Sequence, residues 1–467
     1  MKIYLNNIIH GLACIMLFQT TANAQQVGDF RSNASGNWSN KKITAQSDIS
    51  GVTGATISQN TYTPGTTWKN ATVPATVLVS YINNGTLSNP NTDLNVYNIN
   101  KSTYNKPYWY RATFTIPAAF SGRTVWLNFD GTNKKADIFL NGVSLGTNLG
   151  HMARKKFKFT PVAGTNVIAV MVSPPTFTKG SHDLANLESP TYVVSQGWDW
   201  MPQVPGLNSG IIDDVYLSSS TSVTVEDPWI RTALPSPYNN ATVNIRVQLK
   251  NNTAASVTGN WTGTITPSGQ TFAVNNVTIG ANGTYDGSTN VTIANPILWW
   301  PNGYGGNADG TQQLYKLYTE FKIGATIADS ATRAFGVRNV TWNNTSNTEP
   351  LKVTVNGQPV FCKGGNWGMS EYLLRSRGAE YDTRVKFHKE MNFNMIRNWT
   401  GETTDDEFYD ACDKYGVMIF DDFWLNNSGW IQDADTVQFR NNVVEKIKKF
   451  RNHPSLVLWC GANEGVP

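Results

Sequence analysis

After about Trp342 the chain alternates apolar, strand-like runs with helical segments, and this alternation constrains the fold most strongly. The strand-like runs are PVFCKGGNW, FNMIRNW, VMIFDDFW and LVLWCGANE, and YDTRVKFHKEMN, TTDDEFYDACDKYG and DADTVQFRNNVVEKIKKFRNHP lie between them. The second segment is expected to begin at a Thr cap and to end at a glycine, and the third to stop before Pro454. This order predicts parallel βαβ units. Their length, about 120 residues, is half of a typical (β/α)8 barrel, and a complete four-stranded α/β domain is the alternative.

The preceding part of the chain has the alternating pattern of antiparallel sandwiches. Residues 26 to about 218 contain short runs such as YWYRATFTI, TVWLNFDG and ADIFLNGVSLG, separated by Asn, Gly, Ser and Pro clusters. Asn141-Gly142 lies between two such runs and predicts a tight hairpin. A second all-β stretch, from about Val223 to Val337, has the length of one immunoglobulin-like domain. The sequence therefore predicts a multidomain chain: an N-terminal jelly-roll β-sandwich, an immunoglobulin-like β-sandwich, then the first half of a (β/α)8 TIM barrel.

The first residues, MKIYLNNIIHGLACIMLFQTTANAQQ, have the pattern of a secretory signal. One early lysine precedes a short apolar stretch, and Ala22-Asn23-Ala24 fits a small-x-small cleavage site. We expect cleavage after Ala24 and a secreted or periplasmic protein, with a lipoprotein anchor at Cys14 as the alternative. No later apolar run approaches the length of a bilayer span. The predicted boundaries are 1–24 for the signal peptide, 25–220 and 221–340 for the two sandwiches, and 341–467 for the truncated barrel.

Charge and cysteine content exclude several classes of protein. A formal charge of +4, from 37 basic and 33 acidic residues, is too mild for an electrostatic nucleic-acid binder. The lysine clusters Lys155-Lys156 and Lys446 to Lys449 are expected to be solvated faces. Three cysteines lie beyond the signal, and this odd number predicts buried free thiols at positions 362, 412 and 460 rather than a disulfide framework or a zinc site.

Polar and aromatic side chains gather where the predicted barrel strands end, which is where the catalytic groups of parallel barrels lie. The ends of the first to fourth strands carry Lys363, Asn366 and Trp367; Arg397, Asn398 and Trp399; Asp421, Asp422, Phe423 and Trp424; and Trp459, Asn463 and Glu464. Indole faces suit the C–H face of a sugar ring, while Asn, Arg and Asp suit its hydroxyls. Any single residue has a structural alternative, since a strand-end acid can cap the next helix and a tryptophan can belong to the core.

Glycosidic cleavage requires two carboxyl groups, about 5–5.5 Å apart in the retaining geometry. Glu464 suits the acid/base, because it follows Asn463, whose amide could bind a sugar 2-hydroxyl, and because a half-apolar site would raise its pKa. The partner carboxylate is less well defined. Asp421 and Asp422 are candidates, but either could instead orient Arg397 or cap the next helix.

The chain resembles glycoside hydrolase family 2 over essentially its whole mature length. GWDWMPQVPGLNSGIIDDVYL resembles the sugar-binding sandwich of that family, and ILWWPNGYG and AFGVRNV resemble the end of its middle domain. LKVTVNGQPVFCKGGNW, MNFNMIRNWTGETTDDEFYDACDKYGVMIFDDFW and HPSLVLWCGANEGVP resemble its barrel. Within the family, the pattern is closest to the β-mannosidase branch, which includes endo-β-mannosidases and exo-β-glucosaminidases. Asn-Glu at the predicted acid/base position departs from the GSD context of the exo-β-glucosaminidases that we compare.

The resemblance implies a retaining, exo-acting β-glycosidase for terminal β-linked sugars, with a β-mannoside as the preferred substrate. We expect no cofactor, and no ligand cluster in the sequence demands a metal. The resemblance also implies that Glu464 is the acid/base and Asn463 its neighbouring 2-hydroxyl ligand, and that Asp199 and Trp200 belong to a loop that reaches the sugar pocket. The other predicted substrate-binding residues are Asn366, Trp367, Arg397, Trp399, Trp424 and Trp459. The partner is an oligosaccharide or glycoside, with no nucleic acid and no transmembrane segment; the oligomeric state is not predicted.

The family also implies a nucleophilic glutamate on a later barrel strand, which the given sequence does not contain. We therefore expect this chain to be an N-terminal fragment that does not hydrolyse glycosides by itself. The alternatives are an exo-β-glucosaminidase or endo-β-mannosidase of the same family, a non-catalytic carbohydrate-binding remnant, or, more weakly, an adhesin built from β-sandwiches.

Overall fold

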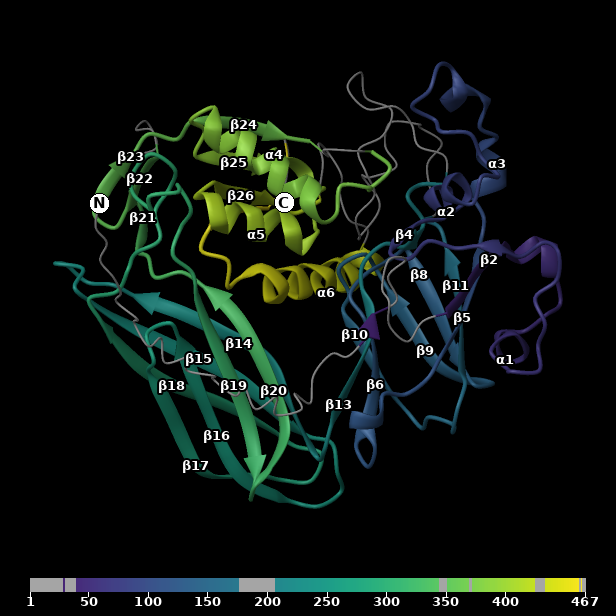
Figure 1. Cartoon of the computed structure of the whole chain (residues 1–467), viewed down its shortest axis with the longest axis horizontal. Helices are drawn as coiled ribbons and strands as arrows, with labels where there is room; N and C mark the ends of the chain where they lie inside the picture. Colours follow the sequence, from purple (N-terminus) through teal and green to yellow (C-terminus); the bar gives the residue numbers. More distant parts are fainter. Residues whose placement is uncertain are drawn as a thin grey trace, which may run out of the picture.

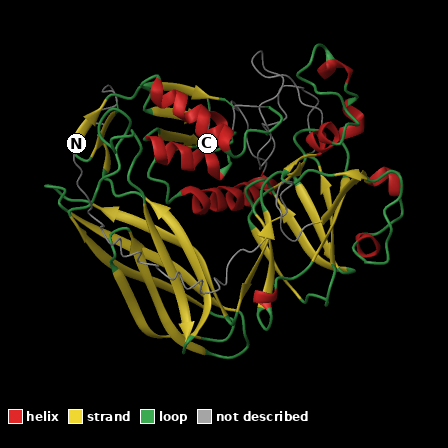
Figure 2. Ribbon diagram, in the orientation of Figure 1, coloured by secondary structure: helices red, strands yellow, loops and turns green. Residues whose placement is uncertain are grey.

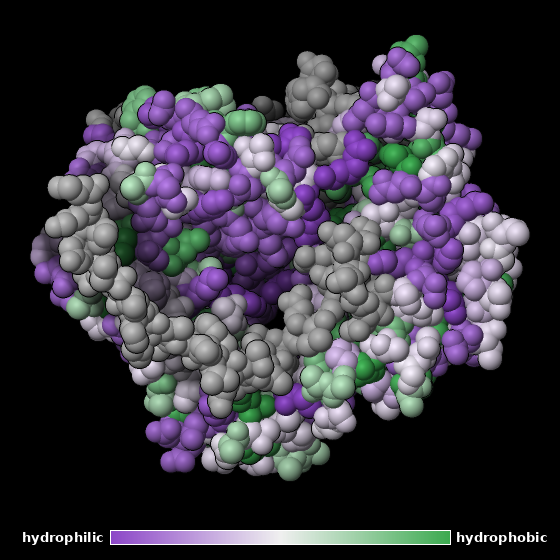
Figure 3. All heavy atoms as spheres, viewed as in Figure 1, coloured by the Kyte–Doolittle hydropathy of each residue, from purple (hydrophilic) through white to green (hydrophobic). Residues whose placement is uncertain are grey.

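The computed structural model describes residues 28–29, 39–175, 206–343, 351–368, 372–424, 433–461 and 463. Two β-rich lobes and one α/β lobe are visible, and the long helix α6 (Asp433–Phe450) runs between them (Figures 1 and 2). The space-filling view in Figure 3 shows a largely hydrophilic recess where the lobes meet. The predicted class, two different β-sandwiches followed by part of a TIM barrel, is confirmed.

The first lobe is a sandwich whose sheets bury a common apolar core. Its six-stranded sheet has the order β3-β2-β5-β11-β8-β9, and it faces a four-stranded sheet, β1-β13-β6-β10, and a small sheet, β4-β12-β7. The strands are β1 (Gly28–Asp29), β2 (Ser39–Ala45), β3 (Lys69–Asn70), β4 (Ala75–Thr76), β5 (Tyr108–Phe114), β6 (Thr124–Phe129), β7 (Thr132–Asn133), β8 (Lys135–Leu140), β9 (Val143–Leu149), β10 (Lys155–Phe159), β11 (Asn166–Ser173), β12 (Gly210–Ile211) and β13 (Val215–Ser220). Three short helices, α1 (Gly54–Ile57), α2 (Val77–Asn83) and α3 (Lys101–Tyr104), lie in the connections.

The predicted Asn-Gly hairpin is confirmed between β8 and β9. Asn141 and Gly142 have φ angles of 51° and 85°, and Leu140 pairs with Val143 directly across the turn. Positive φ at both central residues is the requirement of a type I′ turn, whose twist matches that of the flanking strands. The Asn-Gly dipeptide therefore forms the two-residue connection that the sequence predicts.

The second lobe has the immunoglobulin-like arrangement, with a three-stranded sheet (β14-β15-β18) packed on a four-stranded sheet (β17-β16-β19-β20). The strands are β14 (Val223–Ala233), β15 (Asn240–Asn251), β16 (Val257–Thr266), β17 (Thr271–Ile279), β18 (Thr284–Ala294), β19 (Tyr315–Ile323) and β20 (Thr326–Phe335). Trp261 is fully buried between the sheets, and its indole Nε1 donates to Thr319 Oγ1 at 2.7 Å. The buried indole thus fills the core and keeps its polar atom paired.

The third lobe contains the parallel strands predicted from the alternating pattern. A small antiparallel sheet of β21 (Val340–Asn343), β22 (Lys352–Val355) and β23 (Gln358–Val360) leads into it. The parallel sheet then has the order β24-β25-β26-β27, with helices between successive strands. Its elements are β24 (Gly364–Trp367), α4 (Ala379–Glu390), β25 (Met395–Asn398), α5 (Asp406–Tyr415), β26 (Met418–Asp422), α6 and β27 (Leu456–Cys460).

Three local predictions in this lobe are corrected. The single strand predicted over PVFCKGGNW is split, because Val360 ends an antiparallel hairpin and only Gly364–Trp367 joins the parallel sheet. Cys362 lies in the break and is exposed, so its predicted burial is wrong. Asp405, not a threonine, is the N-cap residue of α5, whereas the predicted glycine stop is confirmed at Gly416, with φ of 71°.

Helix α6 joins the barrel to the first sandwich through Asn442. Its Oδ1 accepts a hydrogen bond from the backbone N–H of Met152 at 3.0 Å, and its Nδ2 donates to the carbonyl of Gln438 at 2.8 Å. Gly150 (φ of 108°) packs so closely that an added Cβ would lie 2.3 Å from the Asn442 amide. None of the described helices is long and apolar enough to cross a membrane.

Asn442→Ala is expected to destabilise the chain by about 1–3 kcal/mol, because it leaves the buried N–H of Met152 without its acceptor. Thermal unfolding of the two proteins measures the loss. Asn441→Ala is the matched control, since Asn441 is the exposed neighbour on the same helix. Equal melting temperatures for both variants would show that the contact contributes nothing to the interface.

Candidate active site

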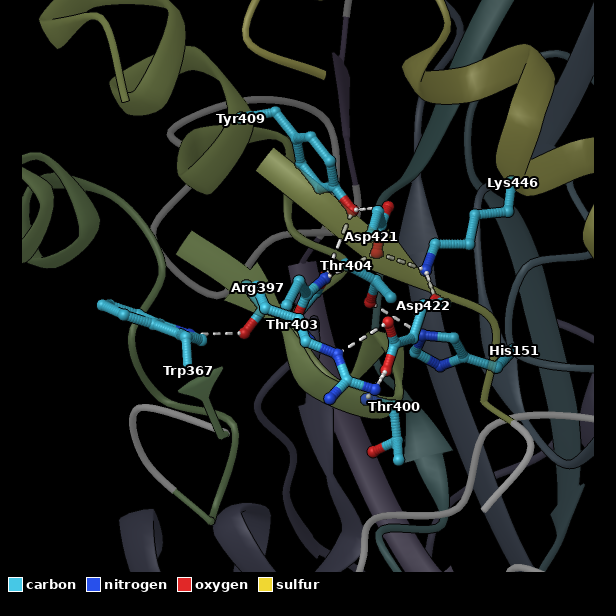
Figure 4. Close-up of polar contacts among 11 residues, drawn as sticks. His151, Trp367, Arg397, Thr400, Thr403, Thr404, Tyr409, Asp421, Asp422 and Lys446 are labelled. Atoms are coloured by element: carbon cyan, nitrogen blue, oxygen red, sulfur yellow. Dashed lines mark hydrogen bonds and ion pairs between the residues drawn. The ribbon is translucent and has the colours of Figure 1, made fainter. Parts of the chain in front are cut away.

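The C-terminal ends of the parallel strands bring polar residues of β25 and β26 together (Figure 4). Asn398 pairs in register with Asp421, and Arg397 pairs with Phe420. Because parallel strands end at the same edge, residues far apart in sequence become neighbours there. Asn463 lies three residues beyond β27 and is buried.

Asp422 holds Arg397 by a two-point ion pair. Arg397 Nε and Nη2 donate to the two carboxylate oxygens of Asp422 at 3.1 and 2.7 Å, and the backbone N–H of Thr400 donates to Asp422 Oδ2 at 3.0 Å. The Asp422 side chain has no exposed surface. Of the roles considered for this acid, orientation of Arg397 is therefore the one that the geometry supports, because both of its oxygens are already engaged.

The guanidinium also contacts the residue that precedes the predicted acid/base. Arg397 Nη2 donates to Asn463 Oδ1 at 3.0 Å, and the arginine side chain remains 24% exposed. This hydrogen bond fixes which end of the Asn463 amide accepts and which end donates. Arg397 therefore connects Asp422 on β26 with the segment after β27.

Asp421 is the centre of a second, fully buried network. Its carboxylate accepts hydrogen bonds from Lys446 Nζ at 2.9 Å, Tyr409 Oη at 2.7 Å and Asn398 Nδ2 at 3.0 Å. Burial raises the pKa of Asp421, and the charge of Lys446 opposes that shift. The network leaves Asp421 with no exposed surface, so it acts as a support for the end of β26 rather than as a group that reaches a ligand.

The prediction that Lys446 to Lys449 form a solvated face is wrong for two of these lysines. The Lys446 side chain is fully buried, donates also to the carbonyl of Asp422 at 2.7 Å, and lies within 6 Å of the rings of Phe423, Trp424 and Trp459. Lys449 is 6% exposed and pairs with Asp213 of the first sandwich at 2.6 Å. Positions 446 and 449 are three residues apart and share a helix face, which a run of like charges does not reveal.

Four of the five tryptophans predicted to bind sugar lie among the described residues, and they differ in exposure. Trp367 and Trp424 are buried in the core of this lobe, and Trp367 Nε1 donates to Thr403 Oγ1 at 2.9 Å. This placement counts against a stacking role for both. Trp399 is buried to the same extent as Trp367, with exposed fractions of 9% and 8%, so the same argument applies to it. Trp459 is half-buried, with its ring stacked on Phe423. Asn366 is exposed on β24. Asp199, Trp200 and Glu464 lie outside the described residues.

A charged network from three elements joins this site to the first sandwich. Asp213 pairs with Lys449 and, at 3.0 Å, with Arg377, which also contacts Asp214 at 3.2 Å. Burial raises the pKa of Asp213, but Lys449 and Arg377 outweigh it and hold this pKa well below its ordinary value. His151 Nε2 lies 2.7 Å from Thr404 Oγ1, and burial lowers the His151 pKa to about 3. Both threonine hydroxyls before α5 thus have partners outside the helix, which explains why neither caps it.

One group of potential metal ligands occurs among the described residues. Asp410, Asp413 and His453 have ligand atoms within 4.8 Å of one another. Asp413 is already fully engaged, since its Oδ2 pairs with His453 Nδ1 at 2.6 Å and its Oδ1 accepts from the N–H and hydroxyl of Ser455. The group is therefore a hydrogen-bonded link between α5 and the start of β27.

Comparison with known proteins relates all three lobes to one family. Residues 55–213 match the glycosyl hydrolase 2 galactose-binding domain-like family, residues 223–338 match glycosyl hydrolases family 2, and residues 349–466 match the TIM barrel domain of family 2. Together these matches span most of the described chain.

Curated relatives and solved structures agree with these matches. A mannosylglycoprotein endo-β-mannosidase of Lilium longiflorum is 29% identical over 86% of this chain and 45% of its own length, and an exo-β-D-glucosaminidase of Streptomyces avermitilis is 27% identical over 86% and 44%. The exo-chitosanase of Amycolatopsis orientalis has the same fold, with a TM-score of 0.79 at 22% identity over 93% of this chain and 48% of that one. The chain spans about half the length of the curated relatives that it matches.

Proposed function

Because the chain belongs to glycoside hydrolase family 2, we propose that it carries the sugar-recognition domains and the acid/base segment of a retaining, exo-acting β-glycosidase whose preferred substrate is a terminal β-mannoside. The relatives named for mannosidase activity, from Lilium longiflorum and Neosartorya fischeri, support this substrate class. We also propose that the protein is exported by the segment that ends near Ala24.

The observation that carries the proposal is the hydrogen bond from Arg397 to Asn463, anchored by Asp422. It fixes an amide at the open edge of the parallel sheet, one residue before Glu464. In the proposed reaction Asn463 donates to the sugar 2-hydroxyl, and Glu464 protonates the glycosidic oxygen as the bond to the leaving group breaks. A carboxylate from another barrel strand would attack the anomeric carbon, and Glu464 would then take the proton of the incoming water.

Sugar binding by the 467-residue chain is the primary test, because binding requires no nucleophile. Arg397→Met is expected to weaken the binding of nitrophenyl β-mannoside about tenfold, since it releases Asn463 from its hydrogen bond. Calorimetric titration measures the dissociation constant. Arg384→Met is the control, because that arginine lies on α4, away from the strand ends, and pairs with the exposed Glu380 in the same helix. Equal affinities for both variants would contradict the role of Arg397.

Hydrolysis is tested on the native protein of the source locus with β-mannoside and β-glucosaminide substrates. Glu464→Gln is expected to abolish turnover of substrates with poor leaving groups, which depend on protonation. Preference for the glucosaminide would favour the second candidate, an exo-β-glucosaminidase, which the relative from Streptomyces avermitilis supports. Sugar binding without any turnover would instead indicate a non-catalytic carbohydrate-binding protein.

A further inference from the structure

A polar cavity lies away from the strand ends, between the immunoglobulin-like sheet and the last turn of α6. It has a volume of about 400 Å³. Its lining comes from β14, β15 and β18 on one side and from α6 and the residue after it on the other. The polar and aromatic lining includes Trp229, Arg246, Gln248, Ser288, Lys448 and Arg451, together with the carboxylates of Asp227 and Asp286.

Three guanidinium groups surround the indole of Trp229. The guanidinium carbons of Arg231, Arg451 and Arg246 lie 4.7, 4.8 and 5.6 Å from the ring centroid. Arg231 and Arg246 extend from the immunoglobulin-like sheet, and Arg451 directly follows α6. We call these three residues the arginine cluster. Bringing three like charges to one ring requires compensation, because cations in close proximity repel one another.

The arginine cluster has only neutral hydrogen-bond partners among the described residues. Arg231 and Arg246 both donate to Asn244 Oδ1, at 3.4 and 3.2 Å, and Arg451 donates to the backbone carbonyl of Asp227 at 2.9 Å. Arg451 Nε is buried with no hydrogen-bond partner in the described chain. Cation–π contacts with one indole offset part of the repulsion but do not supply a counter-charge.

An adjacent cavity of about 590 Å³ shares Asp227, Gln248 and Lys448 with this one. Its cations Arg154, Lys156 and Lys448 differ from the arginine cluster, because they are paired with carboxylates. Arg154 pairs with Asp227 and Glu445 at 2.9 and 2.8 Å, and Lys156 pairs with Glu226. Lys448, at the boundary of the two cavities, pairs with Glu445 at 2.9 Å. The pairs of Arg154 and Lys156 are interdomain salt bridges, and the Lys448–Glu445 pair lies within α6.

Of the two carboxylates in the cavity lining, Asp227 is paired with Arg154 and also lies close enough to Arg451 to favour its charge. Asp286 accepts a hydrogen bond from the neutral amide of Gln248 at 2.9 Å. The lining cations Arg246, Lys448 and Arg451 therefore outnumber the lining carboxylates.

We propose that the cavity beside the arginine cluster binds an oxyanion, a carboxylate or sulfate group, carried by an acidic carbohydrate. The guanidinium fork matches the two oxygens of such a group and can donate to both. Gln248 and Ser288 line the same cavity and offer polar groups to sugar hydroxyls. Only the carbohydrate source rests on the proposed function; the oxyanion chemistry follows from the arginine cluster itself.

The test uses calorimetric titration of the 467-residue chain with sodium sulfate, a β-glucuronide disaccharide and the matching neutral β-glucoside. Arg246→Gln is expected to weaken binding of sulfate and of the glucuronide about tenfold, with no effect on the neutral sugar. Arg246 is exposed and makes one side-chain hydrogen bond, so this variant is expected to fold. Lys316→Gln, which removes one exposed positive charge from β19 of the same domain, is the matched control.

Tighter binding of the glucuronide than of sulfate supports the acidic carbohydrate as the source, and equal binding assigns the site to free anions. The proposal is overturned if neither anion binds, or if Arg246→Gln and Lys316→Gln have the same effect. Binding of nitrophenyl β-mannoside by Arg246→Gln is expected to equal that of the unmodified chain. Failure of mannoside binding in every protein, with anion binding intact, would therefore contradict the proposed function and leave the oxyanion site standing.

Discussion

Lys446→Met is expected to lower the free energy of unfolding of the barrel lobe by about 3–5 kcal/mol, because it leaves the buried carboxylate of Asp421 without its counter-charge. Neither side chain has exposed surface, and their atoms are 2.9 Å apart. Water cannot replace the ammonium group at this depth. Tyr409 and Asn398 still donate to Asp421, but neutral donors do not offset the desolvation of an ion. Urea unfolding followed by far-ultraviolet circular dichroism measures the change.

Two further variants distinguish the effect of breaking the buried ion pair from the effect of removing a lysine side chain. Lys448 lies two residues away on the same helix, and its side chain is 30% exposed. Lys448→Met is expected to lower the free energy of unfolding by less than about 1 kcal/mol. Combining Lys446→Met with Asp421→Asn removes both charges and is expected to recover part of the loss. If Lys446→Met were no more destabilising than Lys448→Met, the buried pair would contribute nothing to stability.

The position of Lys446 shows where prediction from sequence stops. Residues at strand ends can be predicted from the sequence because parallel strands end at the same edge of a sheet. This rule correctly places Arg397, Asp421, Asp422 and Asn463 at one edge. The rule does not cover residues that reach the same edge from a helix. Lys446 reaches Asp421 from the middle of α6, and within EKIKKF nothing distinguishes it from Lys448, which stays partly exposed.

A similar limit applies to the partners of the predicted residues. Threonine before a helix is a good N-cap in general, but Thr403 bonds Trp367 and Thr404 bonds His151 of another domain. Neither partner is local, so local propensity predicts a cap one or two residues too early. The break at Cys362 has the same origin, because an apolar run does not reveal that its first half pairs with β22 and its second half with β25. No sequence pattern links His151 or Asp213 to the barrel, and it is the docking of the domains that brings them to it.

As the pH falls from about 6.5 toward 3, His151 is expected to destabilise the folded chain by up to about 1.4 kcal/mol per pH unit. Burial lowers the His151 pKa from 6.5 to about 3, so over this interval the unfolded chain takes up a proton that the folded chain excludes. Unfolding is therefore favoured increasingly as acid is added. Above pH 6.5 the residue is neutral in both states and contributes no pH dependence. The contact with Thr404 lies at the junction of the first sandwich and the barrel, and so the loss weakens that junction.

Protonation of some nearby carboxyl groups has the opposite effect on folding stability. The contribution of His151 is therefore measured by comparing a variant with the unmodified chain. The pKa of Asp130 is raised to about 7 and that of Asp405 to about 6, both chiefly by burial, so their protonation stabilises the folded chain as the pH falls. His151→Gln removes the imidazole and leaves these acids in place. Its stability, measured by urea unfolding between pH 7 and pH 4, is expected to fall less steeply with acid than that of the unmodified chain. Identical slopes in the two proteins would show that His151 takes up no proton on unfolding.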